Sequence, residues 1–238
     1  MKALVKPFLS EGEFVSSNDM LLSFVWMLSC EFIAEKHPIL TAADLGLNNT
    51  ALYFTYELVK NGYTVVPENY FGNAFFPAAV QTKGEDLEGL SLVEVFARMA
   101  LMTRKVVSDA RKLPPIAAQT ILMYYQTLNG AEGMSANVQS GFRAAVSTIV
   151  KTPVGEIDFG QGPPAWYHFQ GWPSCPFLYG CMPGPCLDGI LIAVPVLAKW
   201  EETFRNSVVR KSIAPDAKDV YAEYSVEELE KKLKKTAK

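Results

Sequence analysis

The stretch Asp158-Phe159-Gly160-Gln161-Gly162 decides the fold of this 238-residue chain. Two glycines within three residues permit a positive φ or a close approach of neighbouring backbone, and an ordinary side chain tolerates neither. Taken alone, the pattern is typical of a tight turn or a β-bulge at the end of a strand. Its significance therefore depends on the segments that accompany it.

Two earlier segments accompany it. Ser16-Ser17-Asn18-Asp19-Met20 opens a long apolar stretch, and Pro67-Glu68-Asn69-Tyr70-Phe71-Gly72-Asn73-Ala74 follows further along the chain. In this order and spacing, the three segments resemble the C-terminal half of the plant-type BAHD acyltransferases, also called HXXXD-type acyl-CoA-dependent acyltransferases. The resemblance runs from about Phe14 to about Phe204.

The chain departs from the pattern of this family in two places. Gln161 stands where the family usually has tryptophan. The base of the family is the histidine of His-x-x-x-Asp, but His37 is followed by Pro-Ile-Leu-Thr and His168 by Phe-Gln-Gly-Trp. In the family that motif lies in the N-terminal lobe, so the resemblance implies about half of the expected enzyme and no catalytic residue in this chain.

The resemblance implies an α/β fold, with one chloramphenicol-acetyltransferase-like lobe in which helices flank a mixed β-sheet. We expect residues 1–16 to form a connector with a short extended piece, and 17–211 to form the lobe. Residues 212–238 are expected to be a charged tail with a short helix, whose many lysines form a solvated face.

Hydrophobic patterns and turn residues predict the individual elements. A buried helix is expected over about 18–36, capped by Ser17 or Asn18, and a helix opened by the capping box of Ser91 and Glu94 to about 112. The remaining expectations are helices to about 128 and over 196–210, a turn at 84–86, and strands at 39–45, within 47–66, and at 75–81, 144–150, 165–170, 177–182 and 189–194.

Composition excludes several classes of partner. A formal net charge of −3 and a pI near 5.5 give no electrostatic case for nucleic acid or an anionic membrane. The most apolar window, Met20 to Ala34, is shorter than the roughly 20 residues that cross a bilayer, so we expect no membrane span. Met1 to Ser10 carries no signal-peptide pattern, and we expect a cytoplasmic protein.

The four cysteines match neither a redox pair nor a paired zinc site. Cys30 lies in the apolar helix and is expected in the core. Cys175, Cys181 and Cys186 lie near His168, and a Cys3His site is the alternative to no metal. We expect reduced thiols and no metal.

The resemblance implies transfer of an acyl group from a coenzyme A thioester to a small-molecule alcohol or amine acceptor, with acyl-CoA as co-substrate and no permanently bound cofactor. Ser16, Ser17 and Asn18 are candidates for contacting acyl-CoA, because a helix N-terminus presents free N–H groups and a positive dipole. The alternative is that they only cap the helix. Tyr70, Phe71 and Asn73 either line a pocket or hold a turn, and the resemblance implies a structural role for Asp158, Phe159, Gly160, Gln161 and Gly162.

Three interpretations stay open. The chain is the coenzyme-A-facing half of an acyltransferase, which needs an N-terminal lobe in trans or self-associates through its exposed interface. Alternatively, it is a non-catalytic ligand-binding or protein-interaction module that kept this fold. The third interpretation is an unrelated α/β binding domain, which three ordered motifs disfavour.

Overall fold

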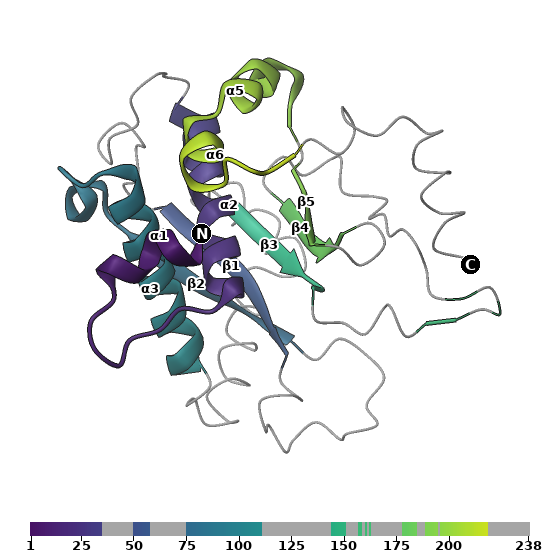
Figure 1. Cartoon of the computed structure of the whole chain (residues 1–238), viewed down its shortest axis with the longest axis horizontal. Coiled ribbons are helices and arrows are strands. Elements are labelled where there is room, and N and C mark those ends of the chain that lie inside the picture. The colour runs from purple at the N-terminus through teal and green to yellow at the C-terminus, as the bar shows by residue number, and fades with distance from the viewer. Residues whose placement is uncertain are drawn as a thin grey trace, which may run out of the picture.

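The computed structural model describes residues 1–34, 50–57, 75–110, 144–150, 157–158, 160, 162, 178–184, 189–194 and 196–218. In this part of the chain, five strands form one mixed sheet in the order β2-β1-β3-β4-β5 (Figure 1). The strands are β1 (Thr50–Glu57), β2 (Phe75–Thr82), β3 (Ala144–Thr148), β4 (Leu178–Pro183) and β5 (Ile190–Ala193).

The centre of the sheet is parallel and its two flanks are antiparallel. β3 runs parallel to β1, with Leu52 opposite Ala144, and parallel to β4, with Val146 opposite Tyr179. β2 pairs with β1, and β5 with β4, in antiparallel fashion. Parallel neighbours need long crossover connections, so the central strands come from distant parts of the sequence. The predicted mixed sheet is confirmed.

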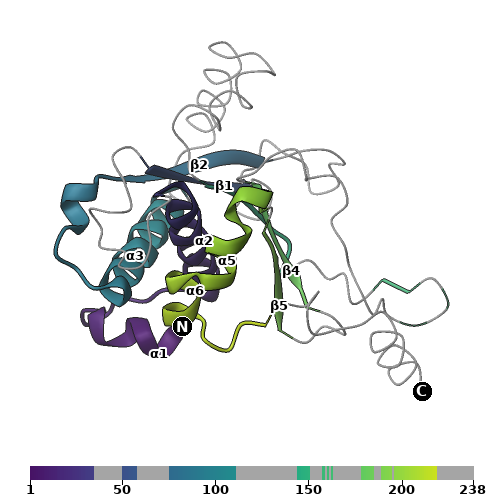
Figure 2. The same cartoon turned by 90° about the horizontal axis from the view of Figure 1, so that it is seen from above.

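Two long helices, α2 (Ser17–Ala34) and α3 (Leu92–Ala110), pack against each other on one face of the sheet (Figure 2). α2 contacts β1 and β3, whereas α3 contacts β2. Every residue from 19 to 32 of α2 is buried. An evenly apolar helix is stable only when it is enclosed on all sides, and the prediction of a buried helix here is confirmed.

α3 begins as its sequence predicts. The backbone N–H of Ser91 donates to Glu94 Oε2 at 2.7 Å, and the N–H of Glu94 donates to Ser91 Oγ at 3.3 Å. This reciprocal capping box satisfies two N–H groups that the first helical turn leaves without partners. Behind it, Val95, Phe96 and Met99 are fully buried and form the face that meets α2 and the sheet.

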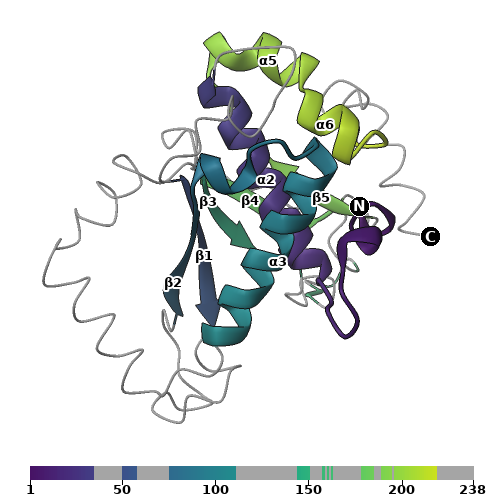
Figure 3. The ribbon, with the colours of Figure 1, turned by 90° about the vertical axis from the view of Figure 1, so that its left-hand side faces the viewer.

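The C-terminal region differs from its prediction. Instead of one helix over 196–210, the chain forms η6 (Ala198–Trp200), α5 (Glu201–Asn206) and α6 (Val208–Ile213). Ser207 breaks the helix with φ −44° and ψ 121°, and its Oγ accepts from Arg210 N at 2.9 Å to start α6. These elements lie over one end of α2 and α3 (Figure 3).

The break at Ser207 has its cause in α2. Glu31 is fully buried there, and its Oε2 accepts from Ser207 Oγ at 2.5 Å while its Oε1 accepts from Val208 N at 2.7 Å. Phe32 next to it stacks on Trp200, with ring centroids 6.0 Å apart and 10° between the planes. A buried carboxylate that needs donors and an aromatic ring that needs a partner therefore fix where α6 begins.

The N-terminal residues also differ from the expected extended piece. They form α1 (Lys2–Val5) and η1 (Lys6–Phe8), and Val5 is fully buried. The predicted turn at 84–86 is the 3-10 helix η3 (Gly84–Leu87). The predictions for 39–45, 165–170, the helix to about 128 and the tail helix fall outside the described residues. Among the described helices, none is both long and apolar enough to span a bilayer.

Candidate functional site

The start of α2 is organised by Ser16 and Asp19. Ser16 N and Ser16 Oγ each lie 2.7 Å from Asp19 Oδ2, and Asp19 N donates to Ser16 Oγ at 3.2 Å. Ser16 is therefore the residue that caps α2, and the expectation that Ser17 or Asn18 does so is wrong. The signal lay in the sequence, because Ser-x-x-Asp is itself a capping-box pattern.

The other two candidate residues lie differently. Ser17 is exposed and Asn18 is half-buried, and neither side chain forms a hydrogen bond with another described residue. Their backbone N–H groups belong to the first turn of an 18-residue helix, where intrahelical acceptors are lacking. Of the three candidate ligand residues, Ser16 is used within the capping box, while Ser17 and Asn18 keep donors that can be offered to a ligand.

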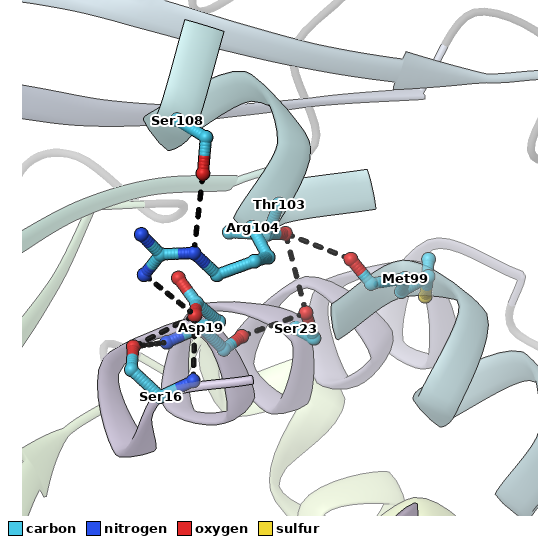
Figure 4. Close-up of polar contacts among 7 residues, drawn as sticks. All are labelled: Ser16, Asp19, Ser23, Met99, Thr103, Arg104 and Ser108. Atoms are coloured by element: carbon cyan, nitrogen blue, oxygen red, sulfur yellow. Dashed lines mark hydrogen bonds and ion pairs between the residues drawn. The ribbon is translucent and has the colours of Figure 1, made fainter. Parts of the chain in front are cut away.

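Arg104 reaches this end of α2 from the middle of α3 (Figure 4). Its Nη1 lies 3.4 Å from Asp19 Oδ2, and its Nε donates to Ser108 Oγ at 3.3 Å. Its Cζ also lies 4.7 Å from the centroid of the Phe14 ring, within reach of a cation–π interaction. The Asp19 side chain is 1% exposed and that of Arg104 is 15% exposed, so the pair neutralises a charge that is costly to bury alone.

α2 and α3 approach closely beside this pair. Ser23 Oγ and Thr103 Oγ1 lie 3.3 Å apart, and both residues are fully buried (Figure 4). Each hydroxyl also bonds a carbonyl one turn back on its own helix, Asp19 O at 2.8 Å and Met99 O at 2.9 Å. Because the hydroxyl protons are used within each helix, the contact between the helices serves close packing. It holds Arg104 within reach of Asp19.

The glycine-rich stretch forms a loop closed by an aspartate. Asp158 Oδ1 accepts from Gly160 N at 2.7 Å and from Gly162 N at 2.9 Å. Gly160 has φ 89° and Gly162 has φ 91°, and no described atom lies within 4 Å of where a Cβ would stand on either. The positive φ of the two glycines is a backbone conformation that glycine adopts without strain. Asp158 and Gly160 are exposed.

Several predicted site residues cannot be placed with these two groups. Tyr70, Phe71, Asn73, Phe159 and Gln161 lie outside the described residues. No hydrogen bond within the described part of the chain joins the start of α2 to the Asp158 loop. Of these two groups, the one at α2 lies at a described helix N-terminus.

Two buried groups of the core, the Tyr179 hydroxyl and the Cys181 thiol, are unsuited to nucleophilic chemistry. Burial raises the pKa of Tyr179, whose hydroxyl lies 2.7 Å from Ser29 Oγ, and burial raises the pKa of Cys181 to about 12. A thiol with so high a pKa holds almost no thiolate at neutral pH. Cys30 is buried, as its sequence context predicts, and neither Cys30 nor Cys181 forms a disulfide bond within the described residues. Within the described residues, no three His, Cys, Asp or Glu side chains form a metal-binding group.

Sequence reasoning missed two members of this site. Asp19 could have been found from the capping-box spacing. Arg104 had no local signal, because it reaches Asp19 across 85 positions of sequence and only the packing of α3 on α2 brings them together.

A mixed sheet covered on one face by two long helices defines this protein as an α/β chain with the chloramphenicol-acetyltransferase-like fold of BAHD acyltransferases. The chain belongs to the Transferase family, whose family model matches residues 10–173. A comparison with curated proteins gives no significant match.

Solved structures of acyltransferases share the fold. TRI101 of F. sporotrichioides, complexed with coenzyme A and T-2, matches with a TM-score of 0.61 and 17% identity over 87% of this chain and 46% of its own. TRI101 of F. graminearum, complexed with ethyl coenzyme A, matches with a TM-score of 0.56 and 17% identity over 87% of this chain and 44% of its own. Vinorine synthase matches with a TM-score of 0.50 and 13% identity over 77% of this chain and 38% of its own. The chain thus spans less than half the length of each of these structures.

Proposed function

We propose that this chain is the coenzyme-A-facing lobe of an acyltransferase, which moves an acyl group from a coenzyme A thioester to an alcohol or amine. The observation that carries the proposal is the family match over residues 10–173, made by a chain that covers 46% of TRI101. TRI101 itself is described as complexed with coenzyme A and T-2, a small molecule. By analogy with TRI101, we propose that acyl-CoA is the co-substrate of this chain and that the acceptor is a small molecule. The proposed reaction needs no permanently bound cofactor.

The chemistry of such a transfer needs a base that this sequence does not supply. A histidine takes the proton of the acceptor, the acceptor oxygen or nitrogen attacks the thioester carbonyl, and the coenzyme A thiolate leaves. Neither His37 nor His168 stands in a His-x-x-x-Asp motif. In our proposal an N-terminal lobe contributes this histidine, and the present chain contributes binding.

Ser17 and Asn18 are the residues that we assign to the ligand. Within the described residues their side chains form no hydrogen bond, and their backbone N–H groups lie at the α2 N-terminus, where the helix dipole favours a phosphate or thioester oxygen. Ser16 supports them as the cap. Roles for Tyr70, Phe71 and Asn73 in lining the pocket, and a cytoplasmic location, remain predictions.

A second candidate function is a non-catalytic module that binds a ligand or a protein with the same fold. The absence of a His-x-x-x-Asp motif from the sequence favours this candidate. The two candidates differ in one measurable outcome. Co-expression with an N-terminal acyltransferase lobe restores acyl transfer from acetyl-CoA only if this chain is half of an enzyme.

The direct test is calorimetric titration of the purified chain with coenzyme A and acetyl-CoA. We expect saturable binding that Asn18→Ala weakens by about threefold to tenfold, the loss of one hydrogen bond. Asn206→Ala makes the same chemical change at an exposed position in α5 and serves as the control. Folded wild-type protein that binds neither ligand would sink the proposal, and equal binding by Asn18→Ala would move the site away from α2.

A further inference from the structure

We infer that Arg104 is a positioning residue that fixes the ligand-facing end of α2. This inference rests on the proposed function, because it concerns the two residues assigned there to coenzyme A. Within the part of the chain that the structure describes, Arg104 forms no hydrogen bond with Ser17 or Asn18. It contacts Phe14, which precedes these two residues, and Asp19, which follows them.

The guanidinium of Arg104 contacts the chain on both sides of Ser17 and Asn18. Phe14 lies before the candidate residues, with the centroid of its ring 4.7 Å from Arg104 Cζ. Asp19 lies after them, with Oδ2 3.4 Å from Arg104 Nη1. Ser17 and Asn18 are therefore held in a short segment whose two ends both meet the same side chain of α3.

Burial shows that each contact depends on Arg104 in a different way. Phe14 is 61% exposed and does not belong to the hydrophobic core, so packing by the core does not fix its position. Asp19 is 1% exposed, and its Oδ1 is buried without a hydrogen-bond partner. With one oxygen already unpartnered, this carboxylate depends strongly on the charge opposite its other oxygen.

The charge of Asp19 also bears on ligand binding. A carboxylate in the first turn opposes a second anion at the same helix end, because it already uses the positive dipole. The Arg104 guanidinium offsets that negative charge from the side of α3. A flat guanidinium can stack on Phe14 while it bonds Asp19 and Ser108, whereas the point charge of lysine cannot do all three.

The test uses coenzyme A as the probe and compares variants of α3. Arg104→Met keeps the apolar stem but loses the contacts with Phe14, Asp19 and Ser108, and we expect its Kd for coenzyme A to rise about tenfold or more. Arg104→Lys keeps the charge and should recover part of that loss. Arg98→Met removes an exposed arginine from the same helix and should change the Kd by less than about twofold.

Hydrogen exchange separates positioning from a general loss of stability. The backbone N–H groups of Ser16, Asp19 and Met20 report on the α2 start, because each donates a recorded bond there. In Arg104→Met they should exchange faster, while amides in the middle of α2 and α3 keep wild-type protection. Uniformly faster exchange with an unchanged Kd would reduce Arg104 to a structural residue and overturn the inference.

A second variant covers the case in which Arg104→Met fails to fold. Phe14→Leu alters an exposed ring and leaves all charges in place, so it should fold, exchange faster at Ser16 and bind coenzyme A a few-fold more weakly. Wild-type binding that neither variant weakens would overturn the inference and leave the proposed function standing. If the wild-type protein does not bind coenzyme A, the proposed function fails. If, in addition, the Ser16 amide of both variants exchanges as slowly as in the wild type, the positioning role of Arg104 is refuted as well.

Discussion

Two aspartates show how one side chain serves opposite purposes in this protein. Asp158 is exposed, and its Oδ1 gathers two backbone N–H groups so that a loop with two positive-φ glycines holds its shape. Asp19 is buried, and its Oδ2 gathers donors from its own cap and from α3. The first stabilises a turn locally, whereas the second joins two helices.

Glu94 gives a pH-dependent prediction at this scale. The hydrogen bonds from Ser91 lower its pKa below the ordinary value near 4.5. A carboxyl with a lowered pKa in the folded state stabilises the fold above its unfolded pKa, and this contribution is lost as the pH falls through the folded pKa. We therefore expect Glu94→Gln to flatten the acid side of the stability profile below about pH 4.5.

The measurement is urea unfolding at several pH values. The difference in unfolding free energy between wild type and Glu94→Gln should shrink as the pH drops below that point. Glu88→Gln makes the same chemical change at an exposed carboxylate outside the capping box and serves as the control. A constant difference from pH 3 to pH 7 would contradict the role of the cap.

At the scale of elements, α2 is the central helix, which contacts α3, the strands β1 and β3, and the C-terminal helices α5 and α6. Its first turn meets α3 through Asp19, its middle meets the strands, and its last turns hold the C-terminal elements through Glu31 and Phe32. The contact of Ser29 with Tyr179 adds a link to β4. An evenly apolar helix with a few buried polar groups can make specific contacts in every direction.

Glu31→Ala tests the hold on α6. The change leaves Ser207 Oγ and Val208 N without an acceptor and opens a small cavity, so we expect a loss of about 2–4 kcal/mol in unfolding free energy. Fast hydrogen exchange should be concentrated in α6. Glu202→Ala removes an exposed glutamate from α5 and should cost less than about 0.5 kcal/mol. Similar losses for the two variants would show that α6 does not depend on Glu31.

The sequence allowed prediction of elements whose causes are local. α2, α3 and the strands follow from apolar runs and the Ser91–Glu94 capping box, because the residues that decide them lie within a few positions. The break at Ser207 was missed, since its cause is Glu31, 176 positions earlier. Arg104 was missed for the same reason. At the candidate site, the Ser-x-x-Asp spacing could have shown that Ser16 is the cap, whereas a role for Ser17 and Asn18 in ligand binding stays a prediction.

For the whole molecule, the folded part of the chain extends beyond the family match. That match ends at residue 173, yet β4 and β5 complete the sheet and α6 packs on α2 and α3. Val209 and Ile213 of α6 are fully buried in the common core. The expected lobe boundary at 211 falls inside α6, which ends at Ile213.

C-terminal truncation tests whether the elements after residue 173 are needed for the fold. A chain that ends at residue 173 loses β4, β5 and α6, and we expect it to lose cooperative unfolding, because Glu31, Phe32 and Ser29 lose their partners. A chain that ends at residue 218 keeps every described element and should unfold like the full chain. Circular dichroism during thermal unfolding distinguishes the two. A cooperative transition in the shorter chain would show that the C-terminal elements are dispensable.

The contacts between α2 and the C-terminal elements have a consequence for how the protein is made. Glu31 leaves the ribosome long before Ser207 and Val208, the residues that bond it 176 and 177 positions later. Parallel pairing of β1 with β3 also waits for distant sequence. Contacts of such high sequence separation make folding slow and expose apolar surface during synthesis. α3, β1 and β3 are made well before the C-terminal elements, so the part of α2 that waits longest for its partners is the last turns, where Glu31 and Phe32 are completed only when Trp200, Ser207 and Val208 have been synthesised.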